Sequence, residues 1–101
     1  MLIYNTTFHV EIADARNFII WLNEVYIPQV EADGKLSTPR LVRILSHKEQ
    51  DSESFSLQWE VADSATLHQW HTQQGANLNA EMLKVFKEKV LAFSTLMEVI
   101  K

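Results

Sequence analysis

Histidine is the residue type in this chain best suited to chemistry near neutral pH, because its side chain titrates there and also binds metal ions. The chain has four histidines and no cysteine. His68 and His71 lie three residues apart in a segment with helical periodicity, so both side chains fall on one helix face and could hold a metal ion. No acidic residue or third histidine stands at helical spacing beside them. We therefore interpret the pair as polar residues on a solvated face, and we predict no metal and no other cofactor.

A second group of polar residues belongs to the first alternating run of the chain. Asn5, Thr7 and His9 share one face of a predicted strand that runs from Leu2 to Val10. If this face looks toward the helices, the three side chains must find hydrogen-bond partners or line a wet cavity. This is the strongest indication of a pocket in the sequence. The alternatives are that the residues are satisfied structural groups or that they face a dimer seam.

Trp70 is the aromatic residue best placed for a binding site. It precedes Gly75, where we expect the helix to be interrupted and a cleft between helix and sheet to open. In such a cleft Trp70 would stack on a ligand, while His9 or His71 would move a proton. The predicted ligand-binding residues are Asn5, Thr7, His9, Trp70 and His71. With only two glycines in the chain, no glycine-rich phosphate loop is present.

Six elements must position these residues, and the apolar periodicity gives their order. Alternating runs are expected at 2–10, 40–46, 55–61 and 90–100, and helical stripes at 18–30 and from 63 or 64 through 86. This order predicts a single α+β domain over residues 1–101, with a ferredoxin-like βαββαβ fold. Its four-stranded antiparallel sheet carries helices on one face only.

Local residue types predict where several elements begin and end. Asp14 is a plausible N-cap of the first helix, and Asp63 or Ser64 of the second. Pro28 should kink or shorten the first helix near Tyr26, and Gly34 should stop it. We expect a hairpin loop over residues 47–54.

Composition limits the partners and the compartment. The 101 residues are 47% hydrophobic and carry a formal net charge of −4, which disfavours nucleic acid and anionic membrane surfaces as partners. The N-terminus lacks a signal-like apolar stretch, and the absence of cysteine fits a reducing compartment, so we expect a cytoplasmic protein. For the same reason we discount the glycosylation sequon at Asn5.

The face of the sheet without helices needs a cover or must be solvated. In the third strand, Phe55, Leu57, Trp59 and Val61 should meet the helices, leaving Ser56, Gln58 and Glu60 on the open face. We expect the other strands to add Tyr4, Phe8, Ile44 and Leu96 to that open face. Because this mixture is too apolar for solvent, we predict a homodimer through the open sheet. The alternative is a monomer with scattered exposed apolar residues.

A strand that ends in a Trp-Glu pair and runs into a Ser-capped helix resembles the dimeric α/β-barrel superfamily. The two segments are LQWEV at 57–61 and DSATLHQW at 63–70, and YIPQV at 26–30 before Gly34 is similar to that group too. Over the whole chain, the start MLIYNTTF and the segment KVLAF at 89–93 resemble a short bacterial family catalogued as a domain of unknown function. This resemblance implies the fold and a dimer, but no activity.

More distant members of the superfamily include cofactor-free monooxygenases of antibiotic biosynthesis and haem-degrading monooxygenases. The resemblance to the haem degraders implies an Asn on the first strand and a Trp on the helix after the third strand, which Asn5 and Trp70 match. It also implies a His further along that helix, and residues 77–81 contain none. The resemblance therefore implies a pocket more than it implies haem turnover.

Three interpretations follow from these patterns. The first is a small-molecule-binding or regulatory dimer without a complete catalytic set. The alternative is a cofactor-free monooxygenase- or isomerase-like enzyme with a pocket between helices and sheet, in which Asn5 orients a carbonyl or an oxyanion. A purely structural dimer is the third interpretation.

Overall fold

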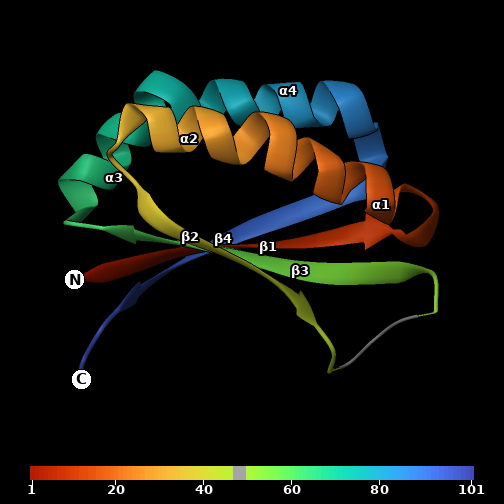
Figure 1. Ribbon diagram of the computed structural model, residues 1–101, viewed down its shortest axis with the longest axis horizontal. Coiled ribbons are helices and arrows are strands. Elements are labelled where there is room, and N and C mark those ends of the chain that lie inside the picture. Colours follow the sequence, from red (N-terminus) through yellow and green to blue (C-terminus); the bar gives the residue numbers. More distant parts are fainter. Residues whose placement is uncertain (47–49) are drawn as a thin grey trace.

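The computed structural model describes residues 1–46 and 50–101, in which strands and helices follow the predicted order (Figure 1). The elements are β1 (Leu2–Glu11), α1 (Ile12–Trp21), the π-helical turn η1 (Leu22–Tyr26), α2 (Ile27–Asp33), β2 (Ser37–Ile44), β3 (Ser52–Val61), α3 (Ser64–Trp70), the π-helical turn η2 (His71–Gly75), α4 (Ala76–Phe86), the 3₁₀ turn η3 (Lys87–Lys89) and β4 (Val90–Glu98). Part of the expected hairpin loop, residues 47–49, lies outside the described residues.

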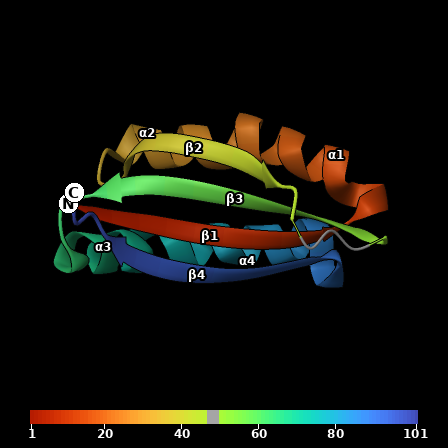
Figure 2. The ribbon, with the colours of Figure 1, turned by 90° about the horizontal axis from the view of Figure 1, so that it is seen from below.

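The strands of the described chain form one antiparallel sheet in the order β2-β3-β1-β4. The helices all lie on one side of this sheet, and the view from below shows the strands uncovered (Figures 1 and 2). These features confirm the predicted α+β, ferredoxin-like fold. None of the helices in the described part of the chain is long and apolar enough to cross a membrane.

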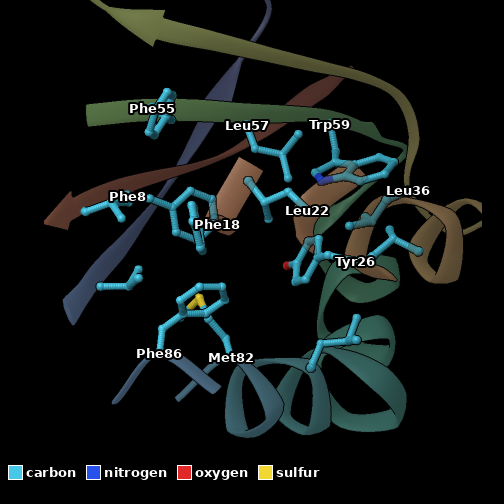
Figure 3. Packing of buried hydrophobic residues seen from close by; sticks show 14 of the residues in the cluster. Phe8, Phe18, Leu22, Tyr26, Leu36, Phe55, Leu57, Trp59, Met82 and Phe86 are labelled. Carbon is cyan, nitrogen blue, oxygen red and sulfur yellow. The ribbon is translucent and has the colours of Figure 1, made fainter. Parts of the chain in front are cut away.

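The core fills the space between the sheet and the helices (Figure 3). The alternation of β3 places Phe55, Leu57, Trp59 and Val61 there, as predicted, and each is at most 3% exposed. From the helices, Phe18 and Leu22 pack onto these side chains in the same cluster. This burial is the main stabilising term of the domain, because it removes apolar area from water.

The expectation that Tyr4, Phe8 and Leu96 lie on the open face is wrong. Phe8 pairs with Phe55 across the β1–β3 ladder, and residues that pair directly share a face, so Phe8 points toward the helices and is buried. Tyr4 has the same parity as Phe8 and pairs with Leu96, which places both on the helix side. Ile44, which pairs with Ser54, lies on the open face as expected.

The first helix differs from its prediction at its start and at Pro28. It begins at Ile12, directly after β1, and Asp14 lies in its first turn, 3.7 Å from the Lys89 ammonium, rather than at the N-cap. Pro28 does not shorten it, because the π-helical turn η1 precedes Pro28 and the Ile27 N–H bonds back to the Leu22 carbonyl. The wider π turn accommodates the proline, which lacks a backbone donor.

The predicted ends that depend on local chemistry are confirmed. Gly34 ends α2 in the left-handed conformation, with φ of 81°. Asp63 caps α3, where its carboxylate accepts a hydrogen bond from the Thr66 backbone N–H at 2.7 Å. This hydrogen bond holds the pKa of the Asp63 carboxyl below its usual value.

Gly75 does not interrupt the second helix, contrary to the prediction. It has right-handed helical dihedrals, and α4 follows η2 without a break. Its role lies in packing, because a Cβ at this position would lie 2.6 Å from Cζ3 of Trp70. The missing side chain lets the indole ring press against the helix backbone.

Candidate functional site

A pocket of about 220 Å³ lies between the helix side of β1 and β4 and the helical segment η2–α4. It is therefore on the side of the sheet where the sequence placed a cleft, although the helix beside it is continuous. The lining residues come from β1, η1, α3, η2, α4 and β4. They are Tyr4, Thr6, Phe8, Tyr26, Trp70, His71, Gly75, Asn79, Met82, Ala92, Phe93 and Ser94.

A row of hydroxyl groups lies where β1 and β4 meet this pocket. Ser94 stands directly opposite Thr6 in the β1–β4 ladder, and their oxygens are 3.2 Å apart. The Tyr4 hydroxyl approaches the same Ser94 oxygen at 3.0 Å. Each of these hydroxyls can donate or accept, so the row can adapt to a donor or an acceptor on a bound molecule.

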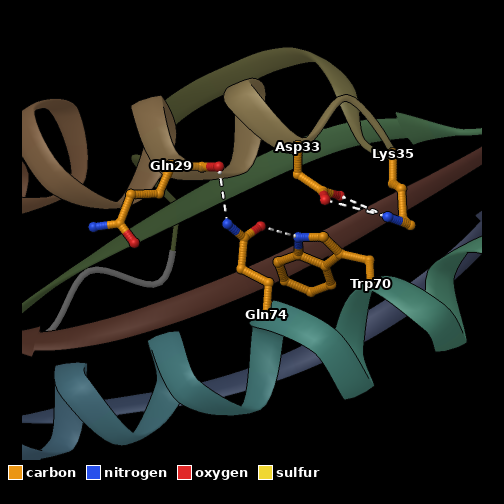
Figure 4. A network of polar contacts seen from close by, with 5 residues as sticks. All are labelled: Gln29, Asp33, Lys35, Trp70 and Gln74. Carbon is orange, nitrogen blue, oxygen red and sulfur yellow. Dashed lines mark hydrogen bonds and ion pairs between the residues drawn. The ribbon is translucent and has the colours of Figure 1, made fainter.

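Trp70 forms an aromatic wall of the pocket and is only 1% exposed. Its ring meets the Tyr4 ring edge-on, with centroids 5.8 Å apart. The indole N–H donates to Oε1 of Gln74 at 2.7 Å, and the Gln74 amide donates to the Gln29 carbonyl at 2.9 Å (Figure 4). These two hydrogen bonds tie η2 to α2. Because the single N–H of the Trp70 indole already donates to Gln74, Trp70 offers a ligand its ring and not a hydrogen bond.

Tyr26 is one of several lining residues that the sequence did not predict, as are Tyr4, Thr6 and Ser94 of the hydroxyl row. Its position in the apolar helical stripe indicated only a core role. It is 8% exposed, yet no hydrogen bond joins its hydroxyl to any group of the described residues. Burial raises the pKa of the Tyr26 phenol well above its usual value, and the nearby Tyr4 phenol raises it further. Tyr26 therefore stays protonated and remains a donor.

His71 is the histidine among the lining residues of the pocket. It stands at the rim, at the start of η2, and its side chain is exposed. A neighbouring hollow of about 240 Å³ shares Tyr4 and His71 and adds Leu67 and His68. Among the described residues, no group of three His, Cys, Asp or Glu side chains could hold a metal ion.

Asn5, Thr7 and His9 lie on the open face of the sheet, away from this pocket. They have opposite parity to Thr6 and Phe8, which face the helices. The Asn5 amide donates to the Thr7 hydroxyl at 3.2 Å and accepts from the Ser56 hydroxyl. The described structure thus satisfies these side chains within the sheet.

His9 is the most distinctive member of this open-face group. Its Nδ1 lies 2.6 Å from the Ser54 hydroxyl, and its ring lies 5.5 Å from the Phe93 ring, centroid to centroid. The structure therefore brings Trp70 and His71 together and keeps Asn5, Thr7 and His9 apart from them. The pocket expected between Asn5 and Trp70 is not formed, because β1 turns its even-numbered residues toward Trp70.

Many solved structures share this fold, and three examples match over nearly their whole length. A Deinococcus radiodurans protein assigned as an antibiotic biosynthesis monooxygenase has a TM-score of 0.71 and 18% identity, covering 100% of this chain and 94% of its own. A variant of MhuD with two manganese protoporphyrin IX molecules bound per active site has a TM-score of 0.72 and 13% identity, covering 100% and 96%. A dimeric ferredoxin-like protein from an uncultured marine organism has a TM-score of 0.66 and 15% identity, covering 99% and 96%.

At these identities the structural neighbours establish the fold alone. No curated protein matches the sequence of this chain. The family described as "Domain of unknown function (DUF4286)" matches residues 1–100, which is almost the whole chain. This match confirms the resemblance drawn from the two ends of the sequence, and the protein belongs to the DUF4286 family.

Proposed function

We propose that the protein binds a small molecule in the pocket between the helix side of β1 and β4 and the segment η2–α4. The observation that carries this proposal is the hydroxyl row of Tyr4, Thr6 and Ser94, which faces an aromatic wall formed by Trp70. Concave sites that combine apolar walls with a few convergent polar groups are the usual form of ligand pockets.

The size and chemistry of the pocket restrict the ligand. Its volume of about 220 Å³ lies below the roughly 300–1,000 Å³ of pockets for drug-sized ligands, which favours a compound of about one or two fused rings. The described lining residues include no Asp, Glu, Lys or Arg. A phosphorylated or strongly charged ligand would find no counter-charge there, so an uncharged or weakly polar molecule fits best.

We further propose that the protein is a homodimer through the open face of the sheet. Apolar side chains flank the polar centre of that face: Val42 is 40% exposed on β2, and Leu91 and Phe93 are 66% and 54% exposed on β4. A second copy would cover these side chains without disturbing the pocket on the other side. The dimeric ferredoxin-like neighbour has the same fold, which supports this proposal.

The alternative function is a cofactor-free monooxygenase- or isomerase-like enzyme that uses the same pocket. The observation that favours it is His71, because this titratable side chain and Tyr4 line both hollows. His71 would accept a proton from the substrate, and the hydroxyl row would hold the oxygen on which charge develops. The Deinococcus radiodurans neighbour motivates a search for oxygen consumption.

The test is a ligand search with a matched pair of variants. Native mass spectrometry of the purified protein reports the subunit count and any bound small molecule, and a recovered compound is then titrated. Ser94→Leu fills the polar floor of the pocket and should weaken binding at least tenfold. Thr95→Leu makes the same type of change at the next residue on the open face and should leave binding unchanged.

Equal binding to both variants would contradict the location of the site. Turnover of the recovered compound, lost in His71→Ala, would favour the enzyme over the binding protein. A cytoplasmic location is part of the proposal, and fractionation of the native cells tests it.

A further inference from the structure

The Tyr26 hydroxyl is the polar end of a buried side chain and has no hydrogen-bond partner among the described residues. Buried tyrosine hydroxyls normally have a hydrogen-bond partner, and a buried group without one calls for an explanation. Tyr26 is more than nine-tenths buried, yet its hydroxyl has no partner among the described residues. By contrast, the indole N–H of Trp70, which lines the same pocket, is paired with Gln74.

The position of the hydroxyl shows where a partner would have to come from. In Figure 3 the Tyr26 oxygen points away from Leu36 and toward the side of the cluster where Met82 lies, and both Tyr26 and Met82 line the pocket. Every fully enclosed side-chain nitrogen or oxygen of the described residues has a partner, so the unpaired Tyr26 oxygen is not fully enclosed. Because Tyr26 lines the pocket, the pocket is the open space that this oxygen can reach. Its hydrogen bond can therefore go only to an occupant of that space.

The chemistry of the occupant follows from the state of the phenol. Because burial and the Tyr4 phenol both raise the pKa of Tyr26, the hydroxyl keeps its proton at physiological pH. A protonated phenol donates readily, and the nearby Tyr4 hydroxyl can donate as well if Ser94 donates to it. Two phenol donors converging on one small pocket match an acceptor oxygen.

We propose that Tyr26 anchors the ligand by donating a hydrogen bond to a carbonyl oxygen, so that the pocket selects small cyclic ketones over hydrocarbons of the same shape. This inference rests on the proposed function, since it names the recognition group and ligand class of the same pocket. Tyr26 reaches the site from η1, opposite the β1–β4 hydroxyl row, and the carbonyl lies between the two. Met82 and Trp70 then contact the ring of the ligand.

The experiment compares 1-indanone with indane, which differ at one ring carbon: it is a carbonyl in 1-indanone and a methylene in indane. Dissociation constants are measured by NMR titration for the wild-type protein and for Tyr26→Phe. The wild type should bind 1-indanone roughly 3- to 10-fold more tightly than indane, as expected for one net hydrogen bond. Tyr26→Phe should bind the two compounds equally, with its affinity for indane unchanged. Indane serves as the internal control, because it reports whether the variant still has its pocket.

A second measurement separates ligand binding from a structural role of the hydroxyl. If the hydroxyl is unpaired in the free protein, Tyr26→Phe should have the same Tm as the wild type or a higher one. A Tm lower by roughly 4 °C or more would reveal a structural partner and overturn the inference.

The remaining outcomes distinguish this inference from the proposed function. If Tyr26→Phe keeps the preference for 1-indanone, or if the wild type binds both compounds equally, the anchor role is wrong while the pocket stands. If neither compound shifts resonances of the pocket residues, both the pocket function and the anchor role fall.

Discussion

Strand β1 presents Tyr4 and Thr6 to the helices, and Asn5, Thr7 and His9 to the open face of the sheet. On the open face, polar side chains bond to neighbours within the sheet, as His9 does with Ser54. On the helix side, hydroxyls gather around a cavity, and the Tyr26 hydroxyl beside them has no partner in the described structure. Paired groups suit a flat surface that another protein copy covers, whereas an unpaired donor beside a cavity suits a ligand.

The largest expected effect comes from a charge on the open face. In Leu91→Asp, the proposed dimer would bury an unpaired carboxylate, which costs about 3 kcal/mol or more and raises the dimer dissociation constant at least about 100-fold. Analytical ultracentrifugation measures this change. Leu83→Asp, a matched exposed leucine on α4, should leave the dimer intact. If Leu91→Asp and Leu83→Asp both dimerise as tightly as the wild type, the open face is not the interface.

The second effect should disturb the helix side alone. Gly75→Val places side-chain atoms against the Trp70 ring, and this overpacking should lower the free energy of unfolding by about 1–3 kcal/mol. Ligand binding should weaken while dimerisation persists. Urea denaturation provides the measurement, with Ala76→Val at the next, exposed position as the control for helix propensity, expected to cost roughly 0.5 kcal/mol. The packing role of Gly75 would be refuted by similar losses in the two variants.

The third effect tests the hydrogen bonds that hold the aromatic wall. Gln74→Ala leaves the buried Trp70 indole N–H without its acceptor and removes the link to Gln29, which should cost about 1–2 kcal/mol of unfolding free energy. Gln73→Ala, at an exposed neighbouring position, should cost almost nothing. Thermal denaturation of the pair is sufficient. If Gln74→Ala is as stable as Gln73→Ala, the wall is held by packing alone.

The smallest effect concerns a region that belongs to neither face. Asp63 caps α3, and its carboxyl has a lowered pKa in the folded protein, so it contributes stability above the unfolded-state pKa of about 4. This contribution is lost as the pH falls through the folded pKa. Asp63→Ala should therefore be slightly less stable than wild type at pH 7, and the difference should vanish at the acid end of a pH series of urea titrations. A difference that persists at the lowest pH would rule out the carboxylate as its cause.

The sequence predicted those parts of the fold that depend on local chemistry. The alternation of β3, the cap at Asp63 and the stop at Gly34 each follow from one residue type in one backbone conformation. Local rules failed where packing prevailed: Gly75 was expected to interrupt a helix, but it makes room for Trp70. Pro28 was expected to kink or shorten a helix, but the helix is not shortened there, because a π turn accommodates the proline.

The candidate site was only half predictable for a related reason. Trp70 and His71 were placed at a cleft beside the helix, and the structure has a pocket there. Asn5 was matched to the same pocket through a resemblance that located it on the right strand. One residue along a strand reverses the face, so a correct strand still put Asn5 on the wrong side. Whether the five predicted residues bind a ligand remains a prediction.

The sequence by itself determined the order of the elements and the division of β1 into two sets of side chains. Both follow from the spacing of apolar and polar residues along the chain, which differs between helices and strands. Only the tertiary structure decided which set faces the helices, since β1 is central and carries large side chains on both faces. That choice depends on pairing with β3 and β4, which are distant in sequence. The same long-range packing brings Tyr26 to the hydroxyl row, and no local pattern could have placed it there.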